Sequence, residues 1–366
     1  MKILQINKLY YPVIGGIETV VQNIAEGFSK QTGDETAVLA CQEKGGRSEE
    51  IINGVKVYRA ASLGKTLGMP LSLDFFRLSR RLCPQYDRII IHYPFPLAAL
   101  ICPFIPKHKL IIYYHADIVR QKISNFLVMP LIKASLKRTK LILTSGNNII
   151  KYSPLLTQFN NKCRAVPFGI NINYKLEDQA EAQLIKKKYS PNNTLILTVG
   201  RLVYYKGLNY AIKAMTKVEA KLLVIGTGPE EKSLRRLIKD NNLGNKVTII
   251  KPQTRLQPFF LAADIFLFPS TAKSEAFGLV QLEAMAAGKA IVNTYLQTGV
   301  EEIGQNGING LSVKPADSEA LARALNTLIA DPELRNNMGA RGQARYQQYY
   351  TLTHFRQRLR DVLNNN

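Results

Sequence analysis

The segment at 274–288, SEAFGLVQLEAMAAG, places Glu275 and Glu283 eight positions apart around an apolar stretch. That stretch has the residues of a helix, and Gly288 is placed to end it. Residues 277–279 would then present free backbone N–H groups at the helix N-terminus, where oxygen ligands are held well. Each carboxylate can accept hydrogen bonds from two neighbouring hydroxyl groups. If the whole segment is helical, the two carboxylates lie at most about 12 Å apart. The spacing therefore predicts a site for a ligand that carries hydroxyl groups at both ends.

A second segment, VGRLVYYKG at 199–207, connects an apolar run to a helical pattern. The run ends at Gly200, and the helix is expected to begin near Gly207, so Arg201 and Lys206 lie on the connection. In open α/β sheets, ligands bind at this edge, beyond the carboxyl ends of the strands. Two cations there would neutralise the negative charge that develops on a diphosphate leaving group. The pair predicts a phosphate site.

Weaker signals lie nearer the N-terminus. Gly15 and Gly16 follow the first apolar run and precede a helical pattern. They would let the backbone approach a phosphate closely, or they form a plain tight turn. His115 ends the apolar run at 109–115, and Asp117 lies just beyond it. A histidine at this position either faces a ligand or makes a structural hydrogen bond, and both interpretations stay open.

Other patterns exclude some kinds of site. Gly226 and Gly228 stand between a strand and a helix, as in a dinucleotide fingerprint, but position 231 is Glu where the third glycine is expected. We interpret this segment as a helix-capping turn. The four cysteines and four histidines show no metal-ligand spacing, so no metal site is expected. Widely separated cysteines also suit a reducing compartment.

Short apolar runs alternate with amphipathic segments along the sequence. This alternation predicts parallel sheets covered by helices on both faces, an α/β class, and its restart in the second half predicts two doubly wound domains. We expect an N-terminal domain over 1–168, a C-terminal domain over 169–345, and a helical tail over 346–366 that can cross back to the first domain. Strands are expected at 2–7, 35–41, 55–60, 87–93, 109–115, 140–145, 194–200, 220–226, 246–250, 264–270 and 289–294.

The chain is strongly basic, with 49 Lys and Arg against 27 Asp and Glu and a formal charge of +22. Within 75–140, twelve basic residues face only Asp87 and Asp117. This surplus favours an anionic partner such as phosphate or a phospholipid surface. No signal peptide is expected, because Lys8 interrupts the opening apolar residues. The uncharged run 89–106 contains four prolines, so we expect a buried strand followed by a loop and a short helix instead of a membrane span.

Taken together and in order, these segments resemble glycosyltransferase family 4 over nearly the whole chain. The resemblance rests on the Gly15-Gly16 pair, the H-x-D segment at 115–117, the G-R-L-x-x-x-K-G stretch at 200–207 and the paired glutamates, with further matches at VPFGIN (166–171) and NGINGLSV (306–313). Members of this family are retaining enzymes of the GT-B fold, in which two Rossmann-like domains with parallel sheets face each other across a cleft. The resemblance implies that fold here.

The family also implies a role for each matching residue. Glu275 would hold hydroxyl groups of the donor sugar, Glu283 the ribose diol, and Arg201 and Lys206 the diphosphate. His115 would lie near the reacting carbon of the donor. The implied catalytic residues are Glu275, His115, Arg201 and Lys206. The implied donor-binding residues are Gly15, Gly16, Arg201, Lys206, Glu275, Ala276, Phe277, Gly278, Leu279 and Glu283. Asp117 and Asn147 are expected on the acceptor side or in support of it.

The resemblance is strongest to enzymes that build bacterial O-antigen and other surface polysaccharides, in segments such as YHADIVRQK (114–122). It implies transfer of a hexose from a nucleotide-diphosphate sugar, with GDP-mannose favoured and a UDP-sugar as the alternative, without a metal cofactor. The implied acceptor is an undecaprenyl diphosphate-linked saccharide, and the implied location is the cytoplasmic face of the inner membrane. The basic N-terminal domain and the mixed apolar and basic segment 62–78 fit an anionic membrane surface.

Two alternatives come from other classes. An NAD-dependent or other nucleotide-sugar-modifying Rossmann enzyme would also have two such domains, but it predicts the complete glycine fingerprint. A non-enzymatic polyanion-binding protein would explain the charge, but it predicts basic residues interleaved with aromatic stacking positions. No nucleic-acid partner is expected.

Overall fold

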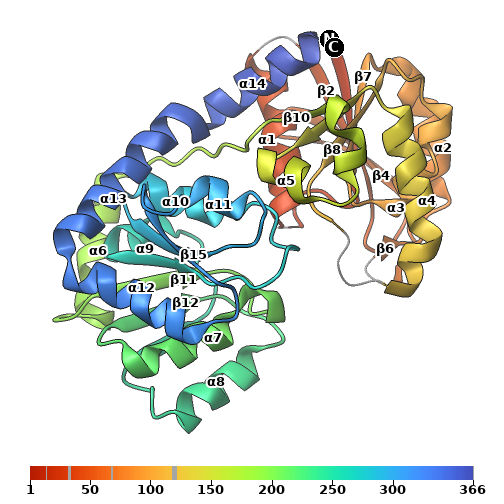
Figure 1. Cartoon of the computed structure of the whole chain (residues 1–366). Helices are drawn as coiled ribbons and strands as arrows, with labels where there is room; N and C mark the ends of the chain where they lie inside the picture. Colours follow the sequence, from red (N-terminus) through yellow and green to blue (C-terminus); the bar gives the residue numbers. More distant parts are fainter. Residues whose placement is uncertain (14, 32–33, 67–68, 118–121, 366) are drawn as a thin grey trace. The chain divides into compact units, whose positions relative to one another are not determined.

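The computed structural model describes residues 1–13, 15–31, 34–66, 69–117 and 122–365 (Figure 1). The chain divides into two compact units. The first comprises Met1–Phe168 together with Phe355–Asn366, and the second comprises Gly169–His354. Each unit is an open α/β sheet with helices packed on it, so the expected class and the two Rossmann-like folds are confirmed.

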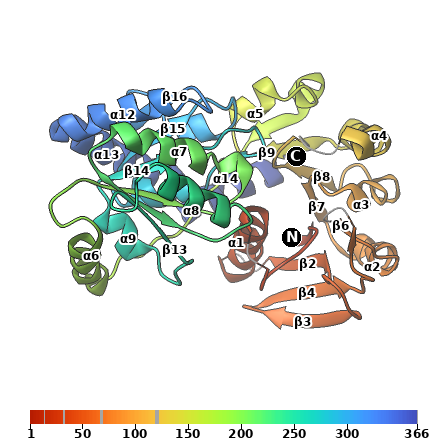
Figure 2. The ribbon, with the colours of Figure 1, turned by 90° about the horizontal axis from the view of Figure 1, so that it is seen from below.

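The sheet of the first unit has eight strands in the order β10-β9-β8-β7-β1-β2-β4-β3. All neighbours are parallel except β3, which runs antiparallel to β4 at the edge (Figure 2). The central strands are Val, Ile and Leu runs buried on both faces, as parallel sheets require. The strands are β1 Lys2–Ile6, β2 Glu35–Cys41, β3 Ser48–Ile52, β4 Val55–Ala60, β7 Arg88–Tyr93, β8 Leu110–Tyr114, β9 Leu141–Thr144 and β10 Cys163–Ala165; β5 Lys65–Thr66 and β6 Met69–Pro70 form a separate hairpin.

Strand β3 was not expected from the sequence. Its residues SEEII are mostly exposed, so they lack the buried apolar alternation that identifies a strand. The charged side chains of Glu49 and Glu50 suit an edge strand, because charge there discourages pairing with another chain.

The helices of the first unit include one from the far end of the sequence. In α14 (Leu352–Asn364), Phe355, Leu359 and Leu363 form a buried stripe at helical spacing. Its Arg356 donates to the Asn23 carbonyl and its Arg360 pairs with Asp34, which anchor it to this unit. The other helices are α1 Gly16–Gln31, α2 Asp74–Leu82, α3 Pro96–Ala99, α4 Lys122–Arg138 and α5 Asn147–Tyr152, with 3-10 turns at Cys83–Gln85, Cys102–Phe104 and Leu156–Lys162.

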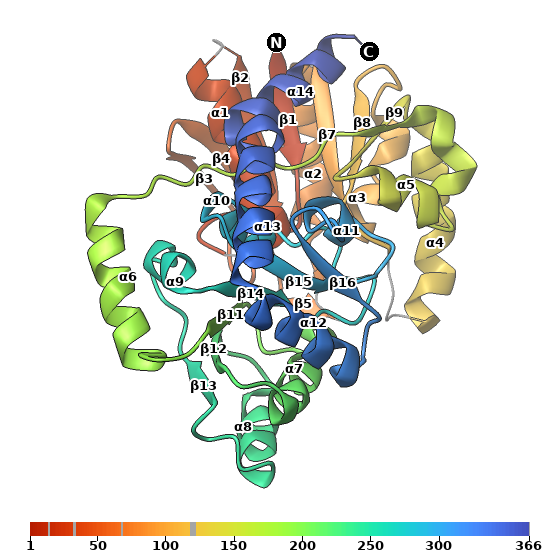
Figure 3. The ribbon, with the colours of Figure 1, turned by 60° about the vertical axis from the view of Figure 1, so that its left-hand side comes forward.

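The second unit has a six-stranded, all-parallel sheet in the order β13-β12-β11-β14-β15-β16. Helices α12 and α13 pack on its β15 and β16 side (Figure 3). A buried apolar cluster joins the sheet to α7, α8 and α12. The strands are β11 Leu195–Val199, β12 Lys221–Ile225, β13 Val247–Ile250, β14 Ile265–Phe268, β15 Ala290–Thr294 and β16 Gly310–Val313.

The first helix of this unit, α6, lies in the polar segment near the unit boundary and was not expected from the sequence. It buries Ala182 and Ile185 and packs against α9. The helices are α6 Leu176–Tyr189, α7 Leu208–Ala214, α8 Glu231–Asp240, α9 Gln257–Ala262, α10 Val280–Ala286, α11 Val300–Ile303, α12 Ser318–Ala330 and α13 Pro332–Arg345, with 3-10 turns at Tyr204–Lys206 and Met215–Lys217 and a π-helical turn at Tyr346–Tyr350.

Candidate active site

The loop between β11 and α7 carries the two predicted phosphate-binding cations. It leaves the strand through Gly200, whose φ is +152°, and enters the helix through Gly207, whose φ is +65°. A Cβ added at Gly207 would lie 2.0 Å from the carbonyl oxygen of Pro269, so only glycine allows this close approach. The backbone N–H of Thr271 donates to the Tyr205 carbonyl at 2.7 Å, which fixes the loop to the end of β14.

Lys206 and Glu275 form an ion pair inside this site. Nζ of Lys206 lies 2.6 Å from Oε2 of Glu275, and the two side chains are only 16% and 12% exposed. The hydroxyl of Ser270 donates to the same carboxylate oxygen at 3.2 Å. Lys206 also lies over the Phe268 ring, 4.9 Å from its centroid, which adds a cation–π contact. Two residues with separate predicted roles therefore hold each other in place.

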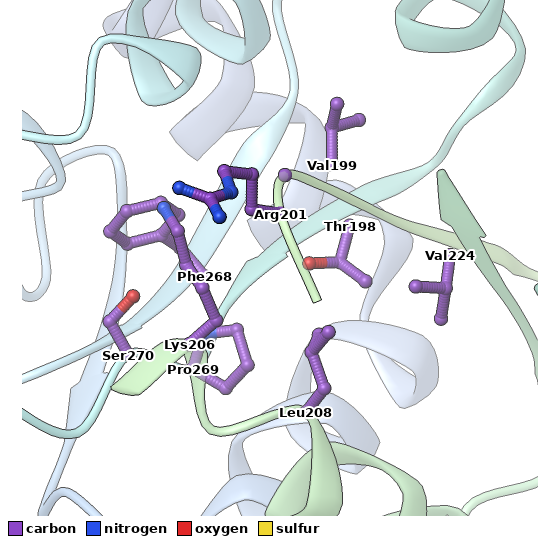
Figure 4. A pocket seen from close by; sticks show the side chains of 10 residues that line it. Thr198, Val199, Arg201, Lys206, Leu208, Val224, Phe268, Pro269 and Ser270 are labelled. Carbon is purple, nitrogen blue, oxygen red and sulfur yellow. The ribbon is translucent and has the colours of Figure 1, made fainter. Parts of the chain in front are cut away.

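Arg201 lies on the same loop, and its side chain is exposed. Among the described residues its guanidinium group has no ion-pair or hydrogen-bond partner. Arg201, Lys206, Phe268 and Ser270 all line one small pocket beyond the carboxyl ends of β11 and β14 (Figure 4). Burial raises the pKa of the nearby Tyr205 hydroxyl, as does the charge of Glu275, while Lys206 and Arg201 oppose the rise. The pocket thus offers one paired and one uncompensated cation, an arrangement that can receive an anion.

The loop between β14 and α10 differs from the sequence expectation. Helix α10 begins at Val280, so residues 275–279 precede it, and the 12 Å limit for a continuous helix does not apply. Gly278 has φ +78°, and a Cβ added there would lie 2.8 Å from the Phe268 ring. This turn ends the non-helical stretch. In the part of the chain that the structure describes, the N–H groups of Ala276, Gly278 and Leu279 donate no hydrogen bond.

A buried network of side chains holds this loop. The Gln281 amide donates to the Phe277 and Val300 carbonyls, and its oxygen accepts from the Asn293 amide at 3.0 Å. Asn293 also donates to the Gly304 carbonyl. Gln281 and Asn293 were not predicted as functional residues from the sequence. Their only sequence signal is a polar residue at a buried position of an apolar run.

Glu283 lies on α10, and its side chain is partly exposed. Burial raises the pKa of its carboxyl group to about 7. The Tyr174 hydroxyl donates to the backbone carbonyl of Glu283 at 3.4 Å, but within the described ranges its carboxylate has no hydrogen-bond partner. Such a carboxylate gains most from a ligand that donates hydrogen bonds, because these favour its charged form.

The remaining predicted residues belong to the first unit. Gly15 precedes α1, and its carbonyl accepts from the Thr19 backbone and hydroxyl. Gly16 begins α1, and no other atom lies within 4 Å of the position that a Cβ would take there. Asn147 begins α5 and lines a second pocket with Lys151 and Arg164.

Asp117 supports the local structure. Its Oδ1 accepts from the Tyr114 hydroxyl at 2.7 Å and from the Ser153 hydroxyl at 2.6 Å. These bonds tie the end of β8 to the segment after α5. The residues directly after it, 118–121, include part of the YHADIVRQK segment and lie outside the described residues.

His115 directly follows β8 and is 4% exposed. Its ring stacks on Tyr113 at 4.9 Å and on Phe168 at 5.6 Å between centroids. Nε2 of His115 lies 2.9 Å from Nδ1 of His92, which the sequence analysis did not single out. Burial lowers the pKa of His115 to about 3, so the ring is neutral near pH 7.

The incomplete fingerprint at 226–228 has a packing role. A Cβ added at Gly226 would lie 1.9 Å from the Gly200 carbonyl oxygen, and one at Gly228 would lie 2.4 Å from that of Leu202. The glycines therefore let the end of β12 pack against the backbone of the β11–α7 loop.

Comparison with known families agrees with this geometry. The family described as Glycosyl transferases group 1 matches residues 178–345, which contain both cations and both glutamates. The family described as Glycosyltransferase Family 4 matches residues 14–174. The chain belongs to glycosyltransferase family 4. The resemblance seen in the sequence is thereby confirmed.

Individual relatives of the enzyme cover nearly its full length. It is 28% identical to the O-antigen chain mannosyltransferase C of Escherichia coli, across 97% of this chain and 95% of that one. It is 27% identical to the D-rhamnosyltransferase WbpZ of Pseudomonas aeruginosa, across 96% and 92%. Among solved structures, HepE of Anabaena in complex with UDP superposes with a TM-score of 0.82 at 19% identity, covering all of both chains. The last likeness supports the GT-B fold of the enzyme.

None of the helices in the described residues combines the length and apolar character that a membrane span needs. The run 89–106 instead forms β7, α3 and a 3-10 turn. No group of three or more His, Cys, Asp or Glu in the described ranges is arranged to hold a metal ion.

Proposed function

We propose that the enzyme transfers a hexose from a nucleotide-diphosphate sugar to a lipid-linked saccharide during synthesis of a bacterial surface polysaccharide. The observation that carries this proposal is the pocket beyond the carboxyl ends of β11 and β14, which is lined by Arg201 and by Lys206 with its ion-pair partner Glu275 beside it. It combines cations for a diphosphate with a carboxylate for hydroxyl groups. The likeness to the E. coli mannosyltransferase supports a mannosyl donor, GDP-mannose, for this enzyme. The UDP complex of the Anabaena protein keeps a UDP-sugar as the alternative.

In this proposal the diphosphate binds Arg201 and Lys206, with the N–H groups of Ala276, Gly278 and Leu279 nearby. Glu275 accepts hydrogen bonds from the sugar, and Glu283 accepts them from the ribose diol. The Gly15 and Gly16 backbone and His115 are assigned to the same donor by the resemblance. Together Arg201 and Lys206 supply positive charge to the leaving group without a metal ion.

The proposed reaction retains the anomeric configuration. The bond from the anomeric carbon to the diphosphate oxygen breaks while the acceptor oxygen bonds to that carbon on the same face. The acceptor hydroxyl proton passes to the departing phosphate oxygen, so the products are a glycosylated acceptor and a nucleoside diphosphate. Lys206 and Arg201 stabilise the charge that develops on that phosphate.

The acceptor and the membrane are assigned to the first unit. Nine basic residues of this unit are candidates for contact with an anionic surface. Three of them already have partners within the protein: Arg81 pairs with Glu49, Lys109 donates to backbone carbonyls, and Arg138 donates to the Ile105 carbonyl. The other six are exposed: Arg77, Arg80, Lys107, Lys133, Lys137 and Lys140. In the segment 62–78, of which 67–68 lie outside the described residues, Leu63, Leu71 and Leu73 are exposed. These features support contact with an undecaprenyl diphosphate-linked acceptor at the cytoplasmic face of the inner membrane.

A thermal-shift screen followed by a transfer assay tests the proposal. GDP-mannose should raise the melting temperature more than UDP-sugars or NAD, because a ligand that binds only the folded state stabilises it. Labelled mannose should then appear on a polyprenyl diphosphate-linked saccharide. Stabilisation by NAD alone would favour the Rossmann-enzyme alternative. Salt-sensitive binding of random DNA without any nucleotide-sugar response would favour a polyanion-binding protein.

A further inference from the structure

Three side chains on neighbouring strands form a hydrogen-bonded line across the sheet of the first unit. Gln5 lies on β1, His92 on β7, and His115 directly after β8. Gln5 is in register with Ile90, and His92 is in register with Tyr113. Because side chains two positions apart point to the same face of a strand, all three side chains lie on one face. From Gln5 to His92, and again from His92 to His115, the line moves two residues towards the carboxyl edge of the sheet.

The line begins at a backbone carbonyl that can only accept. Nε2 of Gln5 donates to the carbonyl of Val21 in α1 at 3.1 Å. This bond fixes the orientation of the Gln5 amide, since its NH2 group must face Val21 and its Oε1 must face the other way. Oε1 lies 3.1 Å from Nε2 of His92. An amide oxygen can only accept, so Nε2 of His92 carries a proton.

The same reasoning continues to His115. A neutral imidazole has one protonated and one bare nitrogen, and burial lowers the pKa of His92 well below its usual value, an effect that nearby His115 reinforces. Nδ1 of His92 is therefore bare and accepts a hydrogen bond. Its partner at 2.9 Å is Nε2 of His115, which must donate. Nδ1 of His115 is then the bare nitrogen at the end of the line.

The surroundings hold this last ring in place. Gln5 and His92 are almost fully buried, and the His115 ring contacts the rings of both Tyr113 and Phe168. Nδ1 of His115 has no hydrogen-bond partner among the described residues. It is also not one of the fully buried side-chain nitrogen and oxygen atoms of those residues that lack a hydrogen bond. It is therefore the one end of the line that a ligand can complete.

We infer that Gln5 and His92 are positioning residues that fix His115 in the Nε2–H tautomer, so that its Nδ1 accepts a hydrogen bond from a substrate hydroxyl group. The inference rests on the proposed function for the identity of that hydroxyl, which belongs to a sugar. It means that His115 recognises a hydroxyl by accepting from it, and does not donate a proton to the leaving group. A sugar that lacks the hydroxyl would leave Nδ1 without a partner and would bind less well.

The tautomers can be read directly from the ring nitrogens. Long-range ¹H–¹⁵N spectra of the unliganded enzyme should show both His92 and His115 protonated at Nε2 and bare at Nδ1, without titration between about pH 5.5 and 8.5. Donor binding should shift Nδ1 of His115 and leave its Nε2 bonded. A proton on Nδ1 of His115, or a ring that titrates in this range, would overturn the inference.

A variant tests the control exerted by Gln5. Gln5→Met keeps a side chain of similar length but removes the acceptor for His92. His115 should then gain a population protonated at Nδ1, and kcat/KM should fall about tenfold, as expected for one hydrogen bond lost in the transition-state complex. Tyr113→Phe is the matched control, because it removes a buried hydroxyl that donates to Val166 and keeps the stacked ring.

The outcomes separate this inference from the proposed function. Unchanged His115 spectra in Gln5→Met, or a loss of kcat/KM no larger than that of Tyr113→Phe, would overturn it. If Gln5→Met does not fold, the spectra of the unchanged enzyme still decide the tautomer. Failure of the proposed function would appear differently, as no transfer from any nucleotide sugar by the unchanged enzyme.

Discussion

Nζ of Lys206 lies 2.6 Å from Oε2 of Glu275, although the two residues are carried by different loops of the second unit. The pair is largely buried, so each charge compensates the other in a medium where an unpaired charge is costly. It also fixes both side chains before a ligand arrives, which reduces the entropy lost on binding. An anionic group that binds Lys206 and a hydroxyl that donates to Glu275 can add to this pair without separating it.

Replacing Lys206 by Met should lower kcat about 100- to 1000-fold, since the charge that develops on the leaving phosphate loses its partner. The substitution also leaves the Glu275 carboxylate unpaired, so the melting temperature should fall as well. Steady-state kinetics and thermal unfolding measure the two effects. Lys213→Met, at an exposed lysine on α7, is the control and should change neither.

The double variant Lys206→Met, Glu275→Gln separates stability from catalysis. Removing both charges should restore much of the melting temperature, because no uncompensated charge remains. Transfer should stay low. Recovery of transfer together with stability would show that Lys206 acts only as a structural partner of Glu275.

Glu275→Ala should abolish transfer while the protein stays folded. The carboxylate is the group proposed to hold the sugar, whereas the loop around it is also fixed by bonds that do not use this carboxylate, such as the one from the Thr298 hydroxyl to the Glu275 backbone carbonyl at 2.9 Å. Circular dichroism and a transfer assay provide the test. Turnover close to that of the unchanged enzyme would remove Glu275 from the mechanism.

Donor affinity should depend on pH through Glu283. Its pKa of about 7 in the folded protein means that it is partly protonated near neutrality. Hydroxyl donors bind the carboxylate form better, so the Kd for the nucleotide sugar should fall as pH rises from 6 to 8. Isothermal titration at several pH values measures this. Glu283→Gln should bind more weakly and lose this dependence, and an identical pH profile in both proteins would contradict the assignment.

The Glu283 carboxyl group should also make the free energy of unfolding depend on pH. A rise in pH should strengthen donor binding but lower the stability of the unliganded enzyme. The carboxyl pKa of Glu283 is raised from 4.5 to about 7, so between these values the folded state binds more protons than the unfolded state. The free energy of unfolding of the unliganded enzyme should therefore decrease as pH rises through this window, by at most about 3 kcal/mol from this group. Urea unfolding of the enzyme and of Glu283→Gln at pH 5 and pH 8 isolates the contribution.

Gly278→Ala should damage the site through the backbone. The residue has φ +78°, and the new methyl group would lie 2.8 Å from the Phe268 ring, which itself packs on Lys206. We expect a loss of stability of about 1–3 kcal/mol and weaker donor binding. Gly244→Ala is the matched control, because no other atom lies within 4 Å of its added Cβ. Equal melting temperatures of the two variants would refute the steric argument.

Charge reversal in the first unit tests the membrane assignment. Arg77, Arg80 and Lys137 are exposed, and each should contribute about 1 kcal/mol of attraction to an anionic bilayer. Replacing all three by Glu should therefore release the enzyme from phosphatidylglycerol vesicles in a flotation assay at moderate salt. Reversal of the exposed Lys213, Lys232 and Lys239 in the second unit is the control. Undiminished flotation of the first triple variant would place membrane contact elsewhere.

The local pattern of the sequence was enough to predict most elements and the position of the cations. The strands at 35–41 and 55–60 have the expected bounds, because short runs that contain Val, Leu or Tyr and are flanked by polar residues favour strands. Arg201 and Lys206 were placed on the correct loop for a similar reason, since a strand, two glycines and a helix define a connection locally. Helix α10 begins at Val280, after the helix N-terminus that was expected at 277–279. The turn at Gly278 delays it, and this turn depends on contact with Phe268 from another strand.

The order of the strands in each sheet decided which distant side chains meet, which the sequence pattern could not predict. Gln5, His92 and His115 meet only because β1, β7 and β8 are neighbours in the sheet, although 87 residues separate the first two. The ring of a lone histidine gives no sequence signal of its tautomer, which is set by the partner on the next strand. The Lys206–Glu275 pair likewise needs β11 and β14 side by side. Local periodicity reflects the physics of single elements, whereas these contacts depend on long-range strand pairing that no short segment encodes.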